Sequence, residues 1–256
     1  MSGFSKKSQH FVPKFYLKRF TFDGKYCYTK NRSGKINCQK IDEICKMKNT
    51  YEIKDDYGIV INKNFVENKL SELDNYCDKF LIRFLKYIDT VENNDIIKFE
   101  TGMEKQALML FFVITLLRNN KVISKTQKML KEQFNIFANE HKSRNRGIKN
   151  IFELSTTWSD KLSKKYSVLI HRNITDKQFI TSDIPIHIVM LGNNEFFYMP
   201  LSPKYFMVLI PKQPPIEMAD MVIENKELDI DFFNSFFSHE NCEKVSISND
   251  VNNFPS

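Results

Sequence analysis

The segment that most constrains the fold is residues 103–118, which predict a helix that is apolar almost all round. Between Leu108 and Leu117, only Thr115 interrupts an otherwise apolar run. A helix without a polar face has to be surrounded by other parts of the protein, so we expect it at the centre of the fold. The run is shorter than the roughly 20 apolar residues that a membrane span needs, which favours a buried helix of a soluble protein.

Further helices are expected on both sides of this segment. Apolar residues recur at helical spacing along residues 65–88, which predicts an amphipathic helix. The remaining helices are expected at residues 121–142, with a lysine-rich side, and, after a break at residues 144–147, at about residues 151–162. The middle of the chain, about residues 62–163, is therefore predicted to be helical.

Strand-like segments flank this helical middle. On its N-terminal side, two strands at residues 25–30 and 35–40 around Asn31-Arg32-Ser33-Gly34 predict a hairpin, and a third strand is expected to include Thr50, Tyr51 and Ile53. On its C-terminal side, strands are expected at residues 166–171, 178–181, 187–191, 196–199, 206–210 and 245–247, with a short helix at residues 229–238. We predict one α+β domain over residues 1–256, with β-rich N- and C-terminal parts around a central bundle of about four helices.

The charge of the chain is unevenly distributed. The net charge is +7, with twelve Lys and Arg against three Asp and Glu in residues 1–50, and two against nine in residues 216–256. The basic region could attract a polyanion such as nucleic acid. Alternatively, the basic and acidic ends attract each other within the fold.

Several classes of site lack their sequence signals. The chain has seven glycines and neither a G-x-G-x-x-G nor a Walker A pattern, so a glycine-rich phosphate loop is not indicated. The five cysteines include no C-x-x-C pair, which argues against a closed zinc site and favours reduced thiols in the cytoplasm. The first residues lack the apolar segment of a signal peptide. We therefore expect a cytoplasmic protein that is not inserted in a membrane.

Three short stretches set polar or ionisable residues beside proline within an apolar frame, at residues 10–20, 179–185 and 199–203. In the first stretch, Pro13 suits the first turn of a helix over residues 14–20, which places His10 just before that helix. In the second stretch, Ser182 and Asp183 end a predicted strand, and Pro185 forces an extended turn.

Together, the three stretches resemble the domain-of-unknown-function 4238 family (DUF4238), an uncharacterised group of mostly bacterial proteins. The resemblance implies that His10, Tyr16, Arg19 and Asp183 belong to a common pattern. It also extends to Glu67, Asp74 and Arg118, although Asp74 stands where the family pattern tends to have Glu. Families of this kind often occur in host-defence contexts, which is an analogy and carries no activity with it.

The ionisable residues of this pattern are the candidate catalytic and metal-binding groups. His10 could act as an acid, a base or a metal ligand, or it could cap the following helix. Asp183 could bind a metal, orient His10 or act as a base, or it could form an Asx turn. Glu67 and Asp74 lie about 20° apart around one helix, where they could share a metal or be ordinary residues at the border of the core.

The candidate substrate-binding residues are Arg19, Arg118, Tyr16 and Ser182. Arg118 ends the most apolar helix, where it could clamp a phosphate or simply interact with the helix dipole. Ser202, in the third stretch, lacks the G-x-S-x-G elbow of a hydrolase, so a nucleophilic serine is not indicated.

These observations leave three hypotheses open. The first is a phosphodiester-acting, nuclease-like enzyme in bacterial defence, with Mg²⁺ or Mn²⁺ held by Glu67, Asp74 and Asp183. The second is a non-catalytic module that binds a nucleotide, another anion or a protein. In the third, the stretches only lock the N-terminal segment onto the late strands, and the working surface lies elsewhere. We favour the first slightly, because ionisable residues from four distant segments recur in a family-like pattern.

Overall fold

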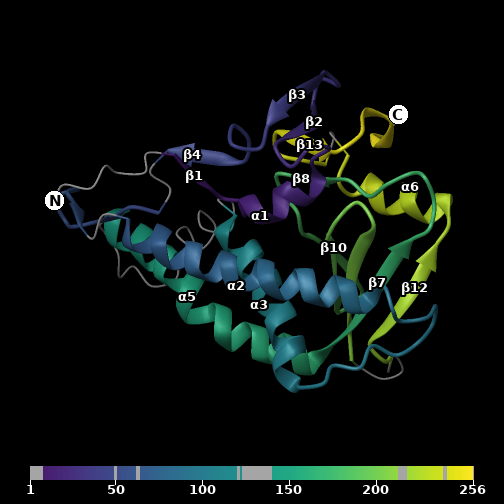
Figure 1. Ribbon diagram of the computed structural model, residues 1–256. Helices are drawn as coiled ribbons and strands as arrows, with labels where there is room; N and C mark the ends of the chain where they lie inside the picture. The colour runs from purple at the N-terminus through teal and green to yellow at the C-terminus, as the bar shows by residue number, and fades with distance from the viewer. Residues whose placement is uncertain are drawn as a thin grey trace.

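The apolar helix predicted at residues 103–118 forms as α3 (Gly102–Arg118) and lies in the helical layer between α2 (Phe65–Ile88) and α5 (Glu140–Lys165) (Figure 1). Eleven of its 17 residues are buried, as its composition predicts. The computed structural model describes residues 8–48, 51–61, 64–119, 122, 140–212, 218–238 and 241–255. None of the helices in these ranges combines the length and the apolar content that crossing a bilayer requires.

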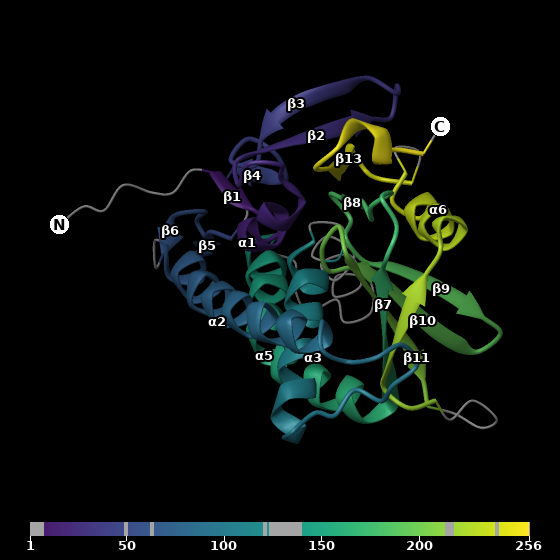
Figure 2. The same cartoon turned by 45° about the vertical axis from the view of Figure 1, so that its right-hand side comes forward.

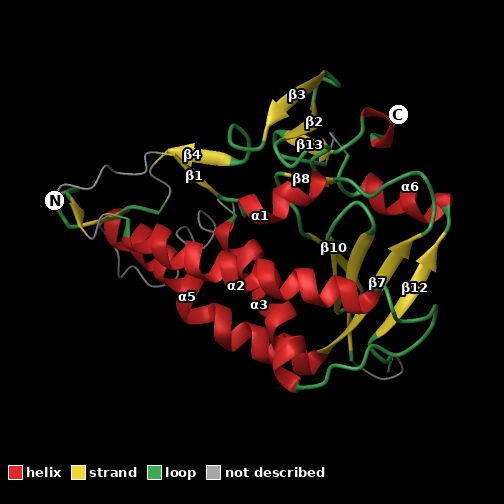
Figure 3. Ribbon diagram, in the orientation of Figure 1, coloured by secondary structure: helices red, strands yellow, loops and turns green. Residues whose placement is uncertain are grey.

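A five-stranded sheet packs against this helical layer, and α6 (Glu227–Ser235) covers its other face (Figure 3). Its strand order is β12-β7-β11-β10-β9, with all neighbours antiparallel except the parallel pair β12 and β7. The strands are β7 (Tyr166–Asn173), β9 (His187–Leu191), β10 (Asn194–Pro200), β11 (Tyr205–Pro211) and β12 (Met221–Asn225). Because side chains alternate along a strand, Met207 and Leu209 of β11 join the core under the helices, whereas Phe206 and Val208 pack toward α6.

A second sheet joins the two ends of the chain. Its order is β3-β2-β13-β8, built from β2 (Tyr26–Asn31), β3 (Ile36–Lys40), β8 (Thr181–Ser182) and β13 (Val245–Ser248). Figure 2 shows this sheet at the end of the molecule away from the helical layer. The shorter elements are β1 (Ser8–His10) paired with β4 (Lys46–Lys48), β5 (Ile53–Lys54) paired with β6 (Val60–Ile61), α1 (Lys14–Leu17), and the 3₁₀ helices η1 (Lys18–Phe20) and η2 (Val251–Asn253).

The predicted α+β class and the hairpin around Gly34 are confirmed. The predicted break at residues 144–147 is wrong, because α5 runs through Gly147 without interruption. A glycine inside a helix costs about 1 kcal/mol relative to alanine. Burial of Ile148 and Ile151 in the main core opposes that cost, and the side-chain amide of Asn145 bonds the backbone N and O of Lys54 at 3.1 and 2.6 Å.

One other segment differs from the prediction, and most of a second lies outside the described residues. Tyr51, expected in a strand, lies in a turn, and β5 begins at Ile53. Most of the helix expected at residues 121–142 falls outside the described residues, and its last three residues belong to α5. The strands β1, β4, β6 and β12 were not predicted, because each is short or pairs with a distant segment.

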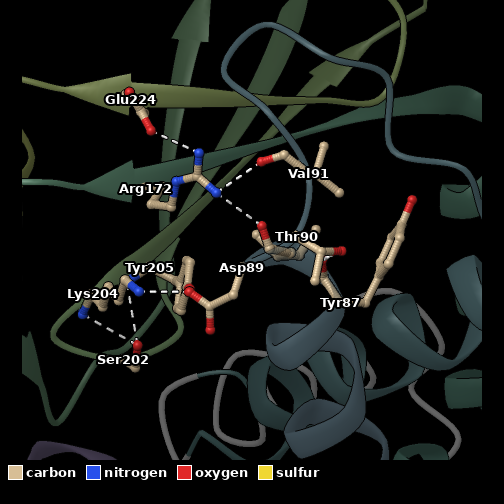
Figure 4. A network of polar contacts seen from close by, with 10 residues as sticks. Tyr87, Asp89, Thr90, Val91, Arg172, Ser202, Lys204, Tyr205 and Glu224 are labelled. Atoms are coloured by element: carbon tan, nitrogen blue, oxygen red, sulfur yellow. Dashed lines mark hydrogen bonds and ion pairs between the residues drawn. The ribbon is translucent and has the colours of Figure 1, made fainter.

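Arg172 of β7 attaches the C-terminal end of α2 to the five-stranded sheet (Figure 4). Its Nη1 donates to the carbonyl oxygens of Ile88 at 3.0 Å and Val91 at 2.8 Å, and its Nη2 donates to Glu224 at 2.7 Å. Carbonyl groups at the end of a helix lack intrahelical partners and favour a cation. Arg172 is therefore a helix cap supplied by a different element of the fold.

Asp89, the residue that follows α2, adds a second attachment (Figure 4). Its Oδ1 accepts from Lys204 Nζ at 2.5 Å and from the hydroxyl of Tyr205, the first residue of β11. The position of α2 against the sheet is thus fixed by polar contacts as well as by packing.

We expect Arg172→Met to lower the free energy of unfolding by about 3 kcal/mol, because it leaves Glu224 unpaired and removes the side-chain donor from the carbonyls of Ile88 and Val91. Urea denaturation followed by circular dichroism measures this change. The matched control is Arg146→Met, whose ion pair with Glu153 joins side chains that are each 50% exposed and which should cost less than about 1 kcal/mol. Equal losses in the two variants would contradict the capping role.

Candidate functional site

Tyr16 of α1 joins the three proline-framed stretches. Its hydroxyl lies 2.6 Å from Thr181 Oγ1, in the second stretch, and donates to the carbonyl oxygen of Pro200, in the third, at 2.8 Å. The side chain is fully buried, and burial raises the pKa of the phenol. A hydroxyl with both neighbours inside the protein serves as a link within the core, so the structure gives Tyr16 no opening toward a substrate.

Ser182 is the last residue of β8, and Asp183 begins the bend that follows this strand. Ser182 Oγ donates to the carbonyl oxygen of Ile184 and accepts from its N–H, at 2.9 and 3.0 Å. The Asp183 carboxylate accepts the backbone N–H of Glu243 at 3.0 Å on one oxygen and that of Lys244 at 2.7 Å on the other. Asp183 is only 2% exposed. Both residues thus organise backbone, and Asp183 fastens the segment that leads into β13.

Arg118 is the centre of a second buried group. Its Nη1 lies 2.6 Å from Asp74 Oδ1 and its Nη2 donates to the carbonyl oxygen of His10 at 2.9 Å. The guanidinium also lies 5.9 Å from the centre of the Tyr51 ring. Burial acts to lower the pKa of Arg118, but Asp74 and Tyr51 more than offset it, so the group stays charged. With these partners inside the fold, Arg118 ties α3 to α2 and β1.

His10 lies in β1 and does not cap α1, whose N-cap is Pro13. Its Nε2 is 3.0 Å from the carbonyl oxygen of Ile41, a contact that assigns the ring proton to Nε2. Burial lowers the pKa of the imidazole, against the opposing effects of Ile41 and Asp42. His10 is therefore a neutral side chain near pH 7, held in place by the backbone.

Asp74 pairs with Arg118, and the negative charge of Glu67 acts on Tyr51 of the same group. A shared role of the two carboxylates stays a prediction. Burial raises the pKa of the Tyr51 phenol, Arg118 opposes this rise, and the negative charges of Glu67 and Asp74 add to it. Arg19 lies apart from this group and pairs with Asp78 of α2 at 2.6 Å. Within the described ranges, no three His, Cys, Asp or Glu side chains are placed together to hold a metal ion.

A groove that the sequence analysis did not identify lies between the C-terminal half of α2 and the segment around the start of α3. It encloses about 550 Å³, and the buried side chains of Phe80, Phe84 and Ala107 line it from below. The rings of Phe80 and Phe84 are 5.7 Å apart and their planes differ by 13°. Phe99 continues the series at 6.0 Å from Phe84 with a plane difference of 5°, so three ring planes are nearly parallel.

Hydrogen bonds join the two walls of this groove and hold one of them against the sheet. The hydroxyl of Tyr87 accepts the backbone N–H of Lys98 at 2.9 Å, which joins α2 to the segment that carries Phe99. One residue beyond Tyr87, the carbonyl of Ile88 is held by Arg172 (Figure 4). The available sequence signal was the aromatic spacing along α2, at residues 76, 80, 84 and 87, which puts four rings on one helix face.

Tyr16→Phe should lower the free energy of unfolding by about 1–3 kcal/mol, because it leaves the Thr181 hydroxyl and the Pro200 carbonyl without their partner inside the core. Urea denaturation measures the loss. Tyr57→Phe removes the same atom from a side chain that is 91% exposed and should change stability by less than about 0.5 kcal/mol. If the two variants are equally stable, Tyr16 does not link the stretches energetically.

The Asp183 carboxyl gives the protein a defined pH dependence. Burial raises its pKa from 3.8 to about 6, against the two backbone N–H bonds that lower it. A carboxyl with a raised pKa binds its proton more tightly in the folded state than in the unfolded state. Protonation of Asp183 therefore stabilises the fold fully below pH 3.8, and this stabilisation is lost as the pH rises through about 6. Wild-type protein should therefore gain stability relative to Asp183→Asn when the pH falls from about 7 to about 5. Thermal melts of both proteins across this range test the sign, and a constant difference in melting temperature would refute it.

Comparison of the sequence with known proteins finds one family match. The model of a family described as protein of unknown function, DUF4238, matches residues 8–250. No curated protein and no solved structure matches the chain. The three stretches that resembled this family, and that meet at Tyr16, all lie within the matched region. Since the match spans nearly the whole sequence, the chain belongs to the DUF4238 family of proteins of unknown function.

Proposed function

We propose that this domain is a non-catalytic binding module that takes a small planar aromatic molecule into the groove between α2 and α3. The observation that carries this proposal is the set of three nearly parallel rings, Phe80, Phe84 and Phe99, beside a hollow of about 550 Å³. Sites for small molecules are typically preformed, mostly apolar hollows of about 300–1,000 Å³. Aligned ring planes favour a flat partner, because a flat ring can stack against them without moving them.

The surface around the groove supports the same proposal. Met103 is 71% exposed and Tyr76 is 50% exposed, and both line the groove. Large apolar side chains that gather at a hollow of the surface, rather than standing alone, are typical of a binding site. The polar attachments of α2 through Arg172 and Tyr87 keep the hollow open without a ligand, which lowers the cost of binding.

The phosphodiester-acting hypothesis receives less support from the geometry. Asp74 and Asp183 each bond groups of the protein itself, and the charged Arg118 is paired with Asp74. A metal-dependent nuclease also needs carboxylates gathered at one point, which the described residues do not provide. The contacts of Tyr16 and Asp183 instead favour a role of the family pattern in holding distant segments together, which leaves the groove as the working surface.

Titration with the fluorescent neutral probe N-phenyl-naphthylamine should show saturable binding of one molecule per chain. Met103→Glu should weaken this binding about tenfold, because it places a carboxylate at the mouth of an apolar site. Leu228→Glu is the matched control, since Leu228 is 83% exposed and, like Met103, is the second residue of its helix. We expect Leu228→Glu to bind the probe as wild type does.

Two results would overturn the proposal. Binding that is equally weakened or equally unchanged in both variants would place the probe outside the groove. Cleavage of labelled DNA or RNA that requires Mg²⁺ or Mn²⁺, stops with chelator, and disappears in a His10→Ala variant with an intact thermal melt would establish the phosphodiester-acting enzyme instead.

A further inference from the structure

The rim of the groove carries two cations whose charge no described residue neutralises. Arg83 and Lys98 both line the groove and are exposed, and neither forms an ion pair within the described part of the chain. They come from different segments, since Arg83 belongs to α2 and Lys98 to the connection that leads to α3. A ligand seated in the groove would therefore have an unpaired cation within the lining contributed by each of these two segments.

Three further charged groups, two carboxylates and one ammonium group, line the groove or lie near it. The Glu104 carboxylate accepts the backbone N–H of Glu100 at 2.8 Å, which directs it toward the backbone at the start of α3. Glu100 itself remains an exposed anion on the rim. The Lys105 ammonium lies 6.0 Å from the centre of the Phe99 ring and is paired with Asp220 at 2.8 Å. The formal charges of Glu100 and Glu104 balance those of Arg83 and Lys98, but no described carboxylate pairs with either cation, so both side chains are available to an anionic group of a ligand.

We infer that the groove is specific for planar aromatic acids, in which a flat ring system stacks along Phe80, Phe84 and Phe99 while one anionic group lies at the opening between Arg83 and Lys98. This inference rests on the proposed function, and it specifies the class of ligand. An acidic group placed there makes charge-assisted hydrogen bonds at the edge of an apolar, partly dry hollow, where such bonds are stronger than in open water. A ligand with a cationic group would be repelled at the same position.

Two fluorescent probes with the same ring system, one anionic and one neutral, distinguish the effect of ligand charge on affinity from the effect of the ring. Anilinonaphthalene sulfonate and N-phenyl-naphthylamine share the same aromatic framework, and only the first carries an anionic group. The measured quantity is the ratio of their two dissociation constants for each protein, which cancels any effect of a variant on the apolar part of the groove. In wild type we expect the sulfonate to bind about tenfold more tightly than the neutral probe.

The test variant replaces both rim cations, Arg83→Gln with Lys98→Gln. Its matched control replaces Arg146 and Lys149 by Gln, an arginine and a lysine exposed on α5 outside the groove, so both proteins lose two positive charges. The preference for the sulfonate should disappear in the test variant, a roughly tenfold change, and should persist in the control.

Each remaining outcome overturns a different statement. If both probes bind wild type with equal affinity, or if the preference survives in the test variant, the groove stands and the specificity for acids is wrong. If the preference falls equally in both variants, the probe senses only the net charge of the chain, and the inference is again wrong. If neither probe binds, the proposed function fails together with the inference.

Discussion

A single buried guanidinium sets the conditions under which the N-terminal part of this fold can form. Arg118 is 2% exposed, and a charge in that position is tolerated only when every neighbouring segment supplies a partner. Asp74 comes from α2, the carbonyl oxygen of His10 comes from β1, and the Tyr51 ring comes from the turn before β5. If any of these segments were displaced, the cation would lose a partner in a place that water does not reach. Arg118 therefore specifies the arrangement as much as it stabilises it.

This requirement gives a physical reason for the polar residues in the family pattern. Apolar side chains stabilise many arrangements that are similar in shape, whereas a buried hydrogen-bonding group is satisfied in few of them. Tyr16, Asp183 and Arg118 each connect segments that are distant in the sequence, and each does so with groups that would be costly to bury alone. Ionisable residues that recur together need not share a reaction, because they can share the task of fixing one topology.

Much of the fold was predictable from local patterns, because these patterns report which face of an element is buried. The apolar spacing along α2 and the wholly apolar run of α3 gave the bounds of both helices to within one residue. The break at Gly147 was a wrong prediction, since a local glycine penalty was weighed without the burial of Ile148 and Ile151. The parallel strand β12 was missed because its pairing with β7 joins residues about 50 positions apart.

For the candidate sites too, local spacing relates residues on one helix but does not show which distant segments come together. Glu67 and Asp74 were expected to act together from their spacing on one helix; the charge of each raises the pKa of the Tyr51 phenol, and their joint action stays a prediction. The groove could not be predicted, because Phe99 reaches Phe84 only through the path of the connection after α2, which no periodic pattern encodes.

The position of β13 has a consequence for the time at which this protein can fold. β13, residues 245–248, lies between β2 and β8, so the hairpin of β2 and β3 receives its inner neighbour from a segment that is synthesised long after it. At about 5–20 residues per second, the chain between β2 and β13 takes roughly 10–40 s to make. Throughout that interval the edge of β2 that β13 will occupy presents unpaired backbone groups to its surroundings. The second sheet is therefore completed only after β13 has been made, and until then the growing chain is exposed to mispairing along β2.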